Sequence, residues 1–250
     1  LAFKANNKIL LKGGKEALHS NKVLVDFWHQ ALKENDLPTD YIQLLVMNRQ
    51  ETQTFLKNPT EKLDLIVPRG GDKLIAFVKE HAKCAVLVSG RGNNFLFVDK
   101  NADWEQSIRV ILNAKSDKIS ACNALDKILI SSQIDNYQEK LNSLEAILKN
   151  NGVSILVDGD IKKVLKNASI LSDESVWKEE FLAMKCCIGV VDSIDEAITK
   201  INKNSGGHSA TIMTKDTDKA QIFMEQVDCA AVYQNASTRF TDGGQMGVGA

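Results

Sequence analysis

The sequence lacks an excess of charge of either sign, and it lacks any long hydrophobic run. Its 31 Lys and Arg residues face 32 Asp and Glu residues, for a formal net charge of -1. No charge asymmetry therefore indicates a nucleic acid or an anionic membrane as a partner. No apolar stretch approaches the ~20 residues that a membrane-spanning helix needs, and no secretory signal opens the chain. We expect a cytoplasmic protein without nucleic-acid or membrane partners.

The sequence also gives no basis for a metal site or a disulfide framework. Its five cysteines are odd in number, show no Cys-x-x-Cys spacing and stand near no pair of histidines. The four histidines are scattered along the chain. We therefore expect no metal and a reducing compartment.

The length and composition are those of ordinary globular domains. The 250 residues are 44% hydrophobic and 25% charged, which suits one large or two medium domains with a sizeable core. The chain opens without Met, and neither end carries a polar tail. We expect it to be a piece of a longer protein.

Short apolar runs alternate with helical patterns along the whole chain. In the first third, strands are expected at 8–12, 41–46, 63–67 and 84–88. The helix expected between the first two of these strands is predicted to bury the apolar positions Leu24, Trp28, Ala31 and Leu32. This alternation predicts βαβ units around parallel sheets, an α/β fold. A glycine-flanked break at 90–92 predicts two domains, 1–89 and 90–250.

Two predicted strand–turn–helix junctions contain paired glycines, in segments 12–16 and 68–73. A helix N-terminus offers unpaired N–H groups, and glycine lets a phosphate approach the backbone closely. Lys12, Lys15 and Arg69 would add positive charge. Neither junction matches the G-x-G-x-x-G dinucleotide pattern, and ordinary βα turns also contain glycine. The pattern alone leaves both interpretations open.

Cys122 differs from the other cysteines in its surroundings. Ser120, Ala121 and Ala124 are small enough to leave room for a ligand, and Asn123 supplies a polar group. An unpaired cysteine is most often a buried structural thiol, so that interpretation stays open at this point. The remaining four cysteines lie in or at the start of apolar runs and are expected in the core: Cys84, Cys186, Cys187 and Cys229.

Polar side chains gather in residues 235–240, directly after the run 229–234, which is the last strand expected from the sequence. Asn235, Ser237, Thr238 and Arg239 could together hold a carboxylate or a phosphate, with Arg239 as the bidentate group. A solvated turn is the alternative. In segment 177–181, adjacent glutamates at 179 and 180 are by pattern alone a surface pair.

Together these segments resemble the gamma-glutamyl phosphate reductases, a family of the aldehyde dehydrogenase superfamily. The resemblance extends over nearly the whole chain, and the matching blocks follow in order along it: 10–22, 64–75, 113–115, 121–125 and 232–250. The sequence departs from the family at 116–121, where "SDKISA" replaces a proline-containing approach to the cysteine.

The resemblance implies an aldehyde dehydrogenase-like fold that binds NADP(H). Residues 1–89 would be the C-terminal part of a Rossmann-type cofactor domain, and residues 90–250 a catalytic domain with Cys122 as its catalytic cysteine. The implied cofactor-binding residues are Lys12, Gly13, Gly14, Lys15, Glu16, Arg69, Gly70, Gly71 and Glu180. The implied substrate-binding residues are Asn123, Asn235, Ser237, Thr238 and Arg239.

The activity implied by the resemblance is the NADPH-dependent reduction of L-glutamyl 5-phosphate to L-glutamate 5-semialdehyde in proline biosynthesis. Phosphate would be released, and a thioester on Cys122 would be the intermediate. Implied partners are this small-molecule substrate, glutamate 5-kinase as a separate or fused protein, and further copies of the full-length chain. Because upstream and downstream family segments contribute to the sites and to oligomer contacts, the isolated 250-residue piece is expected to be inactive.

The segment 85–98 separates this activity from a hydrolytic aldehyde dehydrogenase. Hydrolysis of a thioester needs a base that activates water, and hydrolytic relatives place a glutamate in the corresponding segment. No Asp or Glu occurs in 85–98, which favours the acyl-phosphate reductase. A hydrolytic enzyme, and a silent domain that only binds nucleotide or supports assembly, are the alternatives.

Overall fold

A computed structural model describes residues 2–88 and 92–247. The chain divides into two compact units, Leu1–Val88 and Ser89–Ala250. Each unit contains parallel strands connected through helices, so the predicted α/β fold is confirmed. The assignment of one unit to the cofactor and the other to catalysis stays a prediction.

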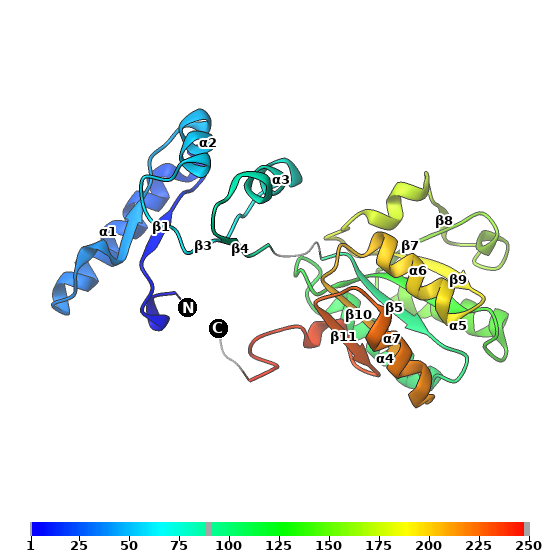
Figure 1. The fold of residues 1–250 in the computed structure, drawn as a ribbon. Coiled ribbons are helices and arrows are strands. Elements are labelled where there is room, and N and C mark those ends of the chain that lie inside the picture. The colour runs from blue at the N-terminus through cyan, green and yellow to red at the C-terminus, as the bar shows by residue number, and fades with distance from the viewer. Residues whose placement is uncertain (1, 89–91, 248–250) are drawn as a thin grey trace. The chain divides into compact units, whose positions relative to one another are not determined.

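The first unit contains two pairs of parallel strands and three α-helices (Figure 1). Strands β1 and β2 pair with each other, as do β3 and β4. In chain order the elements are β1 (Ile9–Leu11), η2 (Lys15–Ala17), α1 (Leu18–Glu34), β2 (Ile42–Leu44), α2 (Arg49–Lys57), β3 (Leu65–Ile66), α3 (Asp72–His81) and β4 (Ala85–Val86), with short 3-10 turns η1 (Phe3–Ala5) and η3 (Thr39–Tyr41).

The buried face of α1 differs from the sequence prediction. Leu24, Trp28 and Ala31 are exposed, whereas Val25 and Leu32 are buried with a residue of β2. Of the four positions predicted to face the core, only Leu32 does so. Apolar residues cover two neighbouring stripes of this helix, so helical periodicity by itself does not choose between them.

The second unit is a doubly wound sheet of seven parallel strands in the order β11-β10-β5-β6-β9-β7-β8. Its strands are β5 (Asn94–Val98), β6 (Leu125–Ser131), β7 (Ser154–Val157), β8 (Ser169–Ile170), β9 (Lys185–Val191), β10 (Ser209–Met213) and β11 (Ala231–Gln234). Its α-helices are α4 (Trp104–Ser116), α5 (Tyr137–Asn150), α6 (Ile194–Asn204) and α7 (Thr217–Gln226), and its 3-10 turns are η4 (Ile161–Lys163), η5 (Glu174–Lys178) and η6 (Thr238–Phe240).

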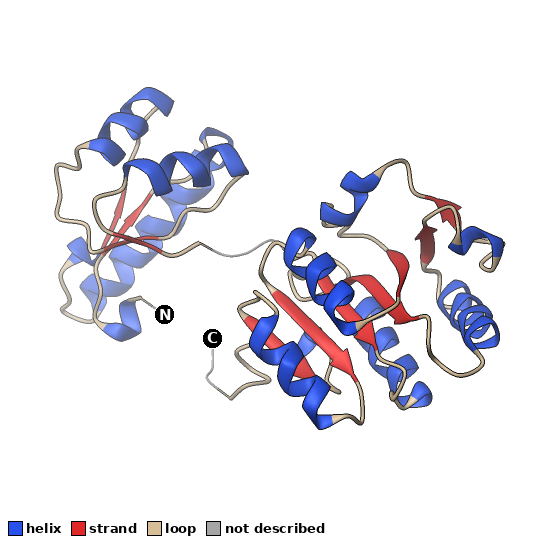
Figure 2. Ribbon diagram, turned by 45° about the vertical axis from the view of Figure 1, so that its right-hand side comes forward, coloured by secondary structure: helices blue, strands red, loops and turns tan. Residues whose placement is uncertain are grey.

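Helices cover both faces of this sheet (Figure 2). Apolar side chains of α4 and α5 pack on one face, and those of α6 and α7 pack on the other. The central strands β5 and β6 are buried along their whole length, as expected for a parallel sheet covered on both faces. The sequence pattern did not single out β5, which is buried throughout and shows no polar–apolar alternation, nor the short strands β7 and β8 of four and two residues.

Candidate functional site

Cys122 lies in the loop between α4 and β6, and its side chain is exposed. The predictions for the other cysteines hold in part. Cys186 and Cys187 are buried in the sheet, and burial raises the pKa of Cys186 to about 12. Cys84 and Cys229 are only half-buried. Of the five thiols, Cys122 is therefore the one that the fold presents to solvent.

The side chain of Asn94, at the start of β5, forms hydrogen bonds with the loop that carries Cys122. Its side-chain amide is fully buried, and the two hydrogens of Nδ2 are shared among three carbonyl oxygens, those of Gly92 at 2.9 Å, Cys122 at 2.7 Å and Ala124 at 2.7 Å. Its oxygen accepts a 2.6 Å hydrogen bond from Ser209 Oγ of β10. One amide thus links β5, β10 and the loop that leads into β6. Sequence reasoning missed this residue, although a polar pair before an apolar run was a signal.

Gly92 lets the cysteine loop approach the beginning of β5. An ideal Cβ at this position would lie 2.7 Å from Cys122 Cα, and closer still to the Cys122 carbonyl oxygen and to a Glu180 carboxylate oxygen. Only a residue without a side chain fits there. The same geometry places Glu180 beside the Cys122 backbone, so the structure brings these two predicted site residues together.

We expect Gly92→Ala to lower any turnover that depends on Cys122 by about 100-fold, because the added methyl group must displace the cysteine loop. Steady-state assays with thermal unfolding of the same sample would check this. Gly159→Ala is the matched control, since a Cβ there meets nothing within 4 Å. Wild-type kcat in Gly92→Ala would contradict the close approach.

A buried ion pair fixes the segment that carries Glu180. Lys115 Nζ, near the end of α4, donates to Asp126 Oδ1 at 2.9 Å, and the side chains are 0% and 2% exposed. The other Asp126 oxygen accepts from the backbone N–H of Phe181 at 2.8 Å. Lys115 belongs to one of the blocks that resemble the family. In the structure it forms a buried ion pair inside this unit.

Lys127 anchors the same segment from its other side. Its Nζ donates to the Glu179 carbonyl oxygen at 2.7 Å and lies 3.7 Å from the centre of the Phe181 ring. Burial lowers the pKa of Lys127 to about 8, against the opposing attraction of Asp126. Residues on both sides of Glu180 are therefore held by β6.

Asn123 joins the cysteine loop to η6. Its amide donates to the carbonyl oxygens of Arg239 at 3.2 Å and Thr241 at 3.1 Å, and its side-chain oxygen accepts from Arg239 Nη1. Thr238 Oγ1 donates to the Asn123 carbonyl oxygen at 2.8 Å. These hydrogen bonds bring three predicted substrate-binding residues together, namely Asn123, which follows Cys122 in the chain, Thr238 and Arg239.

The side chains of Asn235 and Ser237 form hydrogen bonds with backbone groups, one after β10 and one in η6. The Asn235 side chain accepts from Thr214 N at 3.0 Å and donates to Thr214 O at 2.9 Å, which holds the turn after β10. Ser237 Oγ caps η6 by accepting from Arg239 N at 3.2 Å. Both polar groups support the loop backbone, and their roles in substrate binding stay predictions.

The predicted cofactor residues other than Glu180 lie in the first unit, at two turns that follow parallel strands. Gly71 directly precedes α3, and Arg69 is exposed beside it. Lys12 follows β1 and donates to the Gly13 carbonyl oxygen at 2.8 Å. Of the two turns, the one at Gly71 opens directly into an α-helix, and a helix N-terminus suits a phosphate.

The first of these turns differs from the predicted strand–turn–helix pattern. Gly14 leads into the three-residue turn η2, which contains Lys15 and Glu16, and α1 begins only at Leu18. The predicted helix N-terminus is therefore present after Gly71 but is displaced from the first glycine pair.

The described residues show neither a metal-ligand cluster nor a membrane-spanning helix. Within residues 2–88 and 92–247, no three His, Cys, Asp or Glu side chains are grouped so that they could hold a metal ion. None of the helices in these ranges combines the length and apolar character needed to cross a bilayer.

The second unit is a doubly wound sheet whose loops bring the exposed Cys122 close to Gly92 and Glu180. Comparison with known proteins gives the class of protein to which this chain is similar. Residues 135–249 match the model of the aldehyde dehydrogenase family. The fold agrees, because a solved glyceraldehyde-3-phosphate dehydrogenase from Methanocaldococcus jannaschii, complexed with NADP, superposes with a TM-score of 0.68 at 17% identity, covering 94% of this chain and 59% of that one. The chain is therefore similar to the aldehyde dehydrogenase family over residues 135–249, and its fold is that of a solved member.

The chain is similar over its whole length to gamma-glutamyl phosphate reductases. It is 40% identical to the enzyme of Listeria welshimeri and 39% identical to that of Thermotoga maritima, over all 250 residues and 60% of each relative. The crystal structure of the Thermotoga enzyme matches with a TM-score of 0.90 over 100% of this chain and 60% of that one. The resemblance inferred from the sequence is confirmed. The chain spans about 60% of the length of these relatives.

Proposed function

We propose that the full-length protein containing this chain reduces L-glutamyl 5-phosphate to L-glutamate 5-semialdehyde with NADPH, releasing phosphate, as a step of proline biosynthesis. One observation carries the proposal: an exposed Cys122 stands in a chain 40% identical over its whole length to a curated gamma-glutamyl phosphate reductase. The hydrogen bonds of Asn94 and Asn123 support it further, because they hold the loop on both sides of the thiol.

Cys122 would act as the nucleophile through its thiolate. As the sulfur–carbon bond forms, the carbonyl electron pair moves onto oxygen. When the oxyanion pair re-forms the carbonyl, the bond from carbon to the phosphate oxygen breaks, and phosphate leaves with the electron pair of the broken bond. The backbone N–H of Cys122 would stabilise the oxyanion. A thioester on Cys122 results.

The nicotinamide cofactor, when bound, supplies the hydride that reduces the thioester carbonyl. The residues at the two turns of the first unit are proposed to bind it. Collapse of the resulting hemithioacetal breaks the carbon–sulfur bond, returns the Cys122 thiolate and releases the aldehyde. Arg239 would pair with the substrate α-carboxylate and fix the acyl carbon near the thiol.

Phosphate dependence tests this function. In the reverse direction, the full-length protein is expected to reduce NADP⁺ with glutamate semialdehyde only when inorganic phosphate is added, because phosphate must take the acyl group from Cys122. The measurement is the absorbance of NADPH across a phosphate titration. Undiminished turnover in phosphate-free buffer would refute the proposal.

Hydrolytic aldehyde oxidation is the second candidate, and the position of Glu180 favours it. Although segment 85–98 contains no acidic residue, the fold brings this carboxylate from a distant segment to the Cys122 backbone. A carboxylate there could activate water. The phosphate titration separates the two functions, since a hydrolytic enzyme turns over without phosphate.

A further inference from the structure

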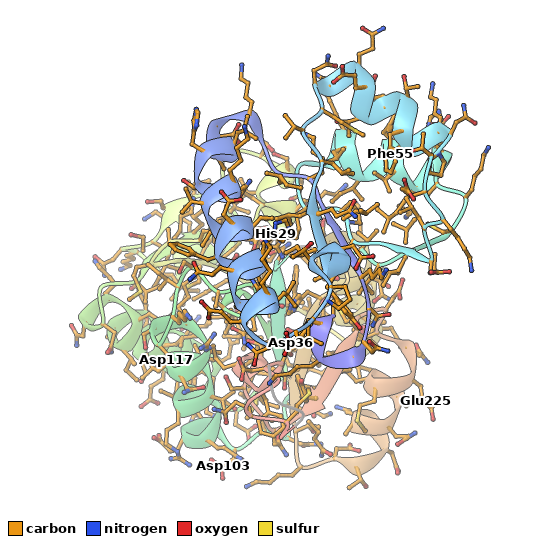
Figure 3. All side chains as sticks on the ribbon, turned by 90° about the vertical axis from the view of Figure 1, so that its left-hand side faces the viewer. His29, Asp36, Phe55, Asp103, Asp117 and Glu225 are labelled. Carbon is orange, nitrogen blue, oxygen red and sulfur yellow. The ribbon has the colours of Figure 1, made fainter. Side chains whose placement is uncertain are left out.

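Arg239 stands beside a carboxylate that sequence reasoning did not single out. Asp117, directly after α4, accepts hydrogen bonds on one oxygen, Oδ2, from Arg239 Nη2 at 3.3 Å and Nε at 3.4 Å. Figure 3 labels Asp117 at the end of α4 opposite Asp103. The guanidinium is also bonded to Asn123, the neighbour of Cys122 in the chain. A positive and a negative group thus lie together next to the cysteine loop.

Stability does not account for the position of Asp117. Its side chain is 60% exposed and that of Arg239 is 18% exposed, and an ion pair with so much solvent contact contributes little to folding. A carboxylate at the C-terminal end of a helix also faces the negative end of the helix dipole. Asp117 is therefore placed against the helix dipole without a clear gain in folding stability, and such a position indicates a functional role.

We propose that Asp117 and Arg239 together bind the α-amino-acid end of the substrate, and this rests on the function proposed above. Arg239 receives the α-carboxylate, and Asp117 receives the α-ammonium group. The two opposite charges of an amino-acid zwitterion match the two opposite charges of the pair. The α-carbon is only a few bonds from the acyl carbon, so a substrate whose acyl carbon reaches Cys122 has its charged end near the residue that follows it.

This assignment makes Asp117 a specificity-determining residue for amino-acid substrates. An acyl substrate with the carboxylate alone would still pair with Arg239 but would leave Asp117 without its ammonium partner. Discrimination between the two substrates is therefore predicted to depend on the charge of Asp117.

The test compares two aldehydes in the reverse assay of the full-length protein, with NADP⁺ and phosphate. Glutamate semialdehyde carries the amino group, whereas 5-oxopentanoate has the same carboxylate and aldehyde without it. Asp117→Asn is expected to lower kcat/KM for glutamate semialdehyde by roughly 10- to 100-fold, the value of a charge-assisted hydrogen bond, and to leave kcat/KM for 5-oxopentanoate within about 2-fold. Asp160→Asn is the control, because Asp160 is 95% exposed in an ion pair of its own, and it should change neither value.

Each remaining outcome decides against the assignment. An equal loss for both aldehydes would mean that Asp117 acts only by holding Arg239. No loss for either aldehyde would mean that Asp117 does not meet the substrate. If the wild-type protein turned over neither aldehyde with phosphate present, the proposed function itself would fail, and this assignment with it.

Discussion

Cys122→Ala is expected to reduce phosphate-dependent turnover of the full-length protein by at least about 1,000-fold, the scale on which loss of a covalent nucleophile acts. Without the sulfur, neither the thioester nor the hemithioacetal can form. The variant should remain folded, because the thiol is exposed and an exposed substitution changes stability by only about 0.5 kcal/mol. NADPH formation and a urea unfolding curve on the same preparation measure both quantities.

Cys229→Ala provides the matched control for this experiment. That thiol belongs to the same unit but is half-buried, and it donates to Ser205 Oγ rather than lying in the cysteine loop. Its kcat should stay close to the wild-type value. If Cys122→Ala turned over like the wild type, Cys122 would not be the nucleophile, and both enzymatic proposals would be wrong.

Lys115→Met is expected to lower the free energy of unfolding by about 3–5 kcal/mol. The substitution leaves Asp126 as a buried charge that keeps only one of its two bonded partners, the Phe181 N–H. Urea denaturation monitored by circular dichroism measures the change. Activity should fall as well, since the segment that carries Glu180 loses one of its anchors.

The chain offers an exposed ion pair as a control. Lys163 and Asp160 lie 3.1 Å apart with side chains 79% and 95% exposed, so Lys163→Met should have no measurable effect on stability. Replacing both buried partners, Lys115→Met with Asp126→Leu, should recover much of the loss because no unpaired charge remains. Equal effects of Lys115→Met and Lys163→Met would show that burial does not set the strength of the pair.

Local sequence set Cys122 apart from the other thiols but left its role open, and the family resemblance supplied the predicted site residues. Small neighbours distinguished Cys122 from the thiols in apolar runs, and the structure places its side chain in solvent. The polar group at 235–240 was recognised, and the structure brings two of its members, Thr238 and Arg239, to Asn123. Asn94 and Asp117 were not recognised, because their importance depends on partners far away in the chain.

The sequence by itself determined the alternation of strands and helices, since hydrophobic periodicity and turn residues act within a few positions. It did not determine which stripe of α1 is buried, because two stripes of that helix are apolar and the choice depends on what packs against them. Only the tertiary structure decided that Gly92, Cys122 and Glu180 meet. These residues precede β5, β6 and β9, and the order of those strands in one parallel sheet is what brings their loops together.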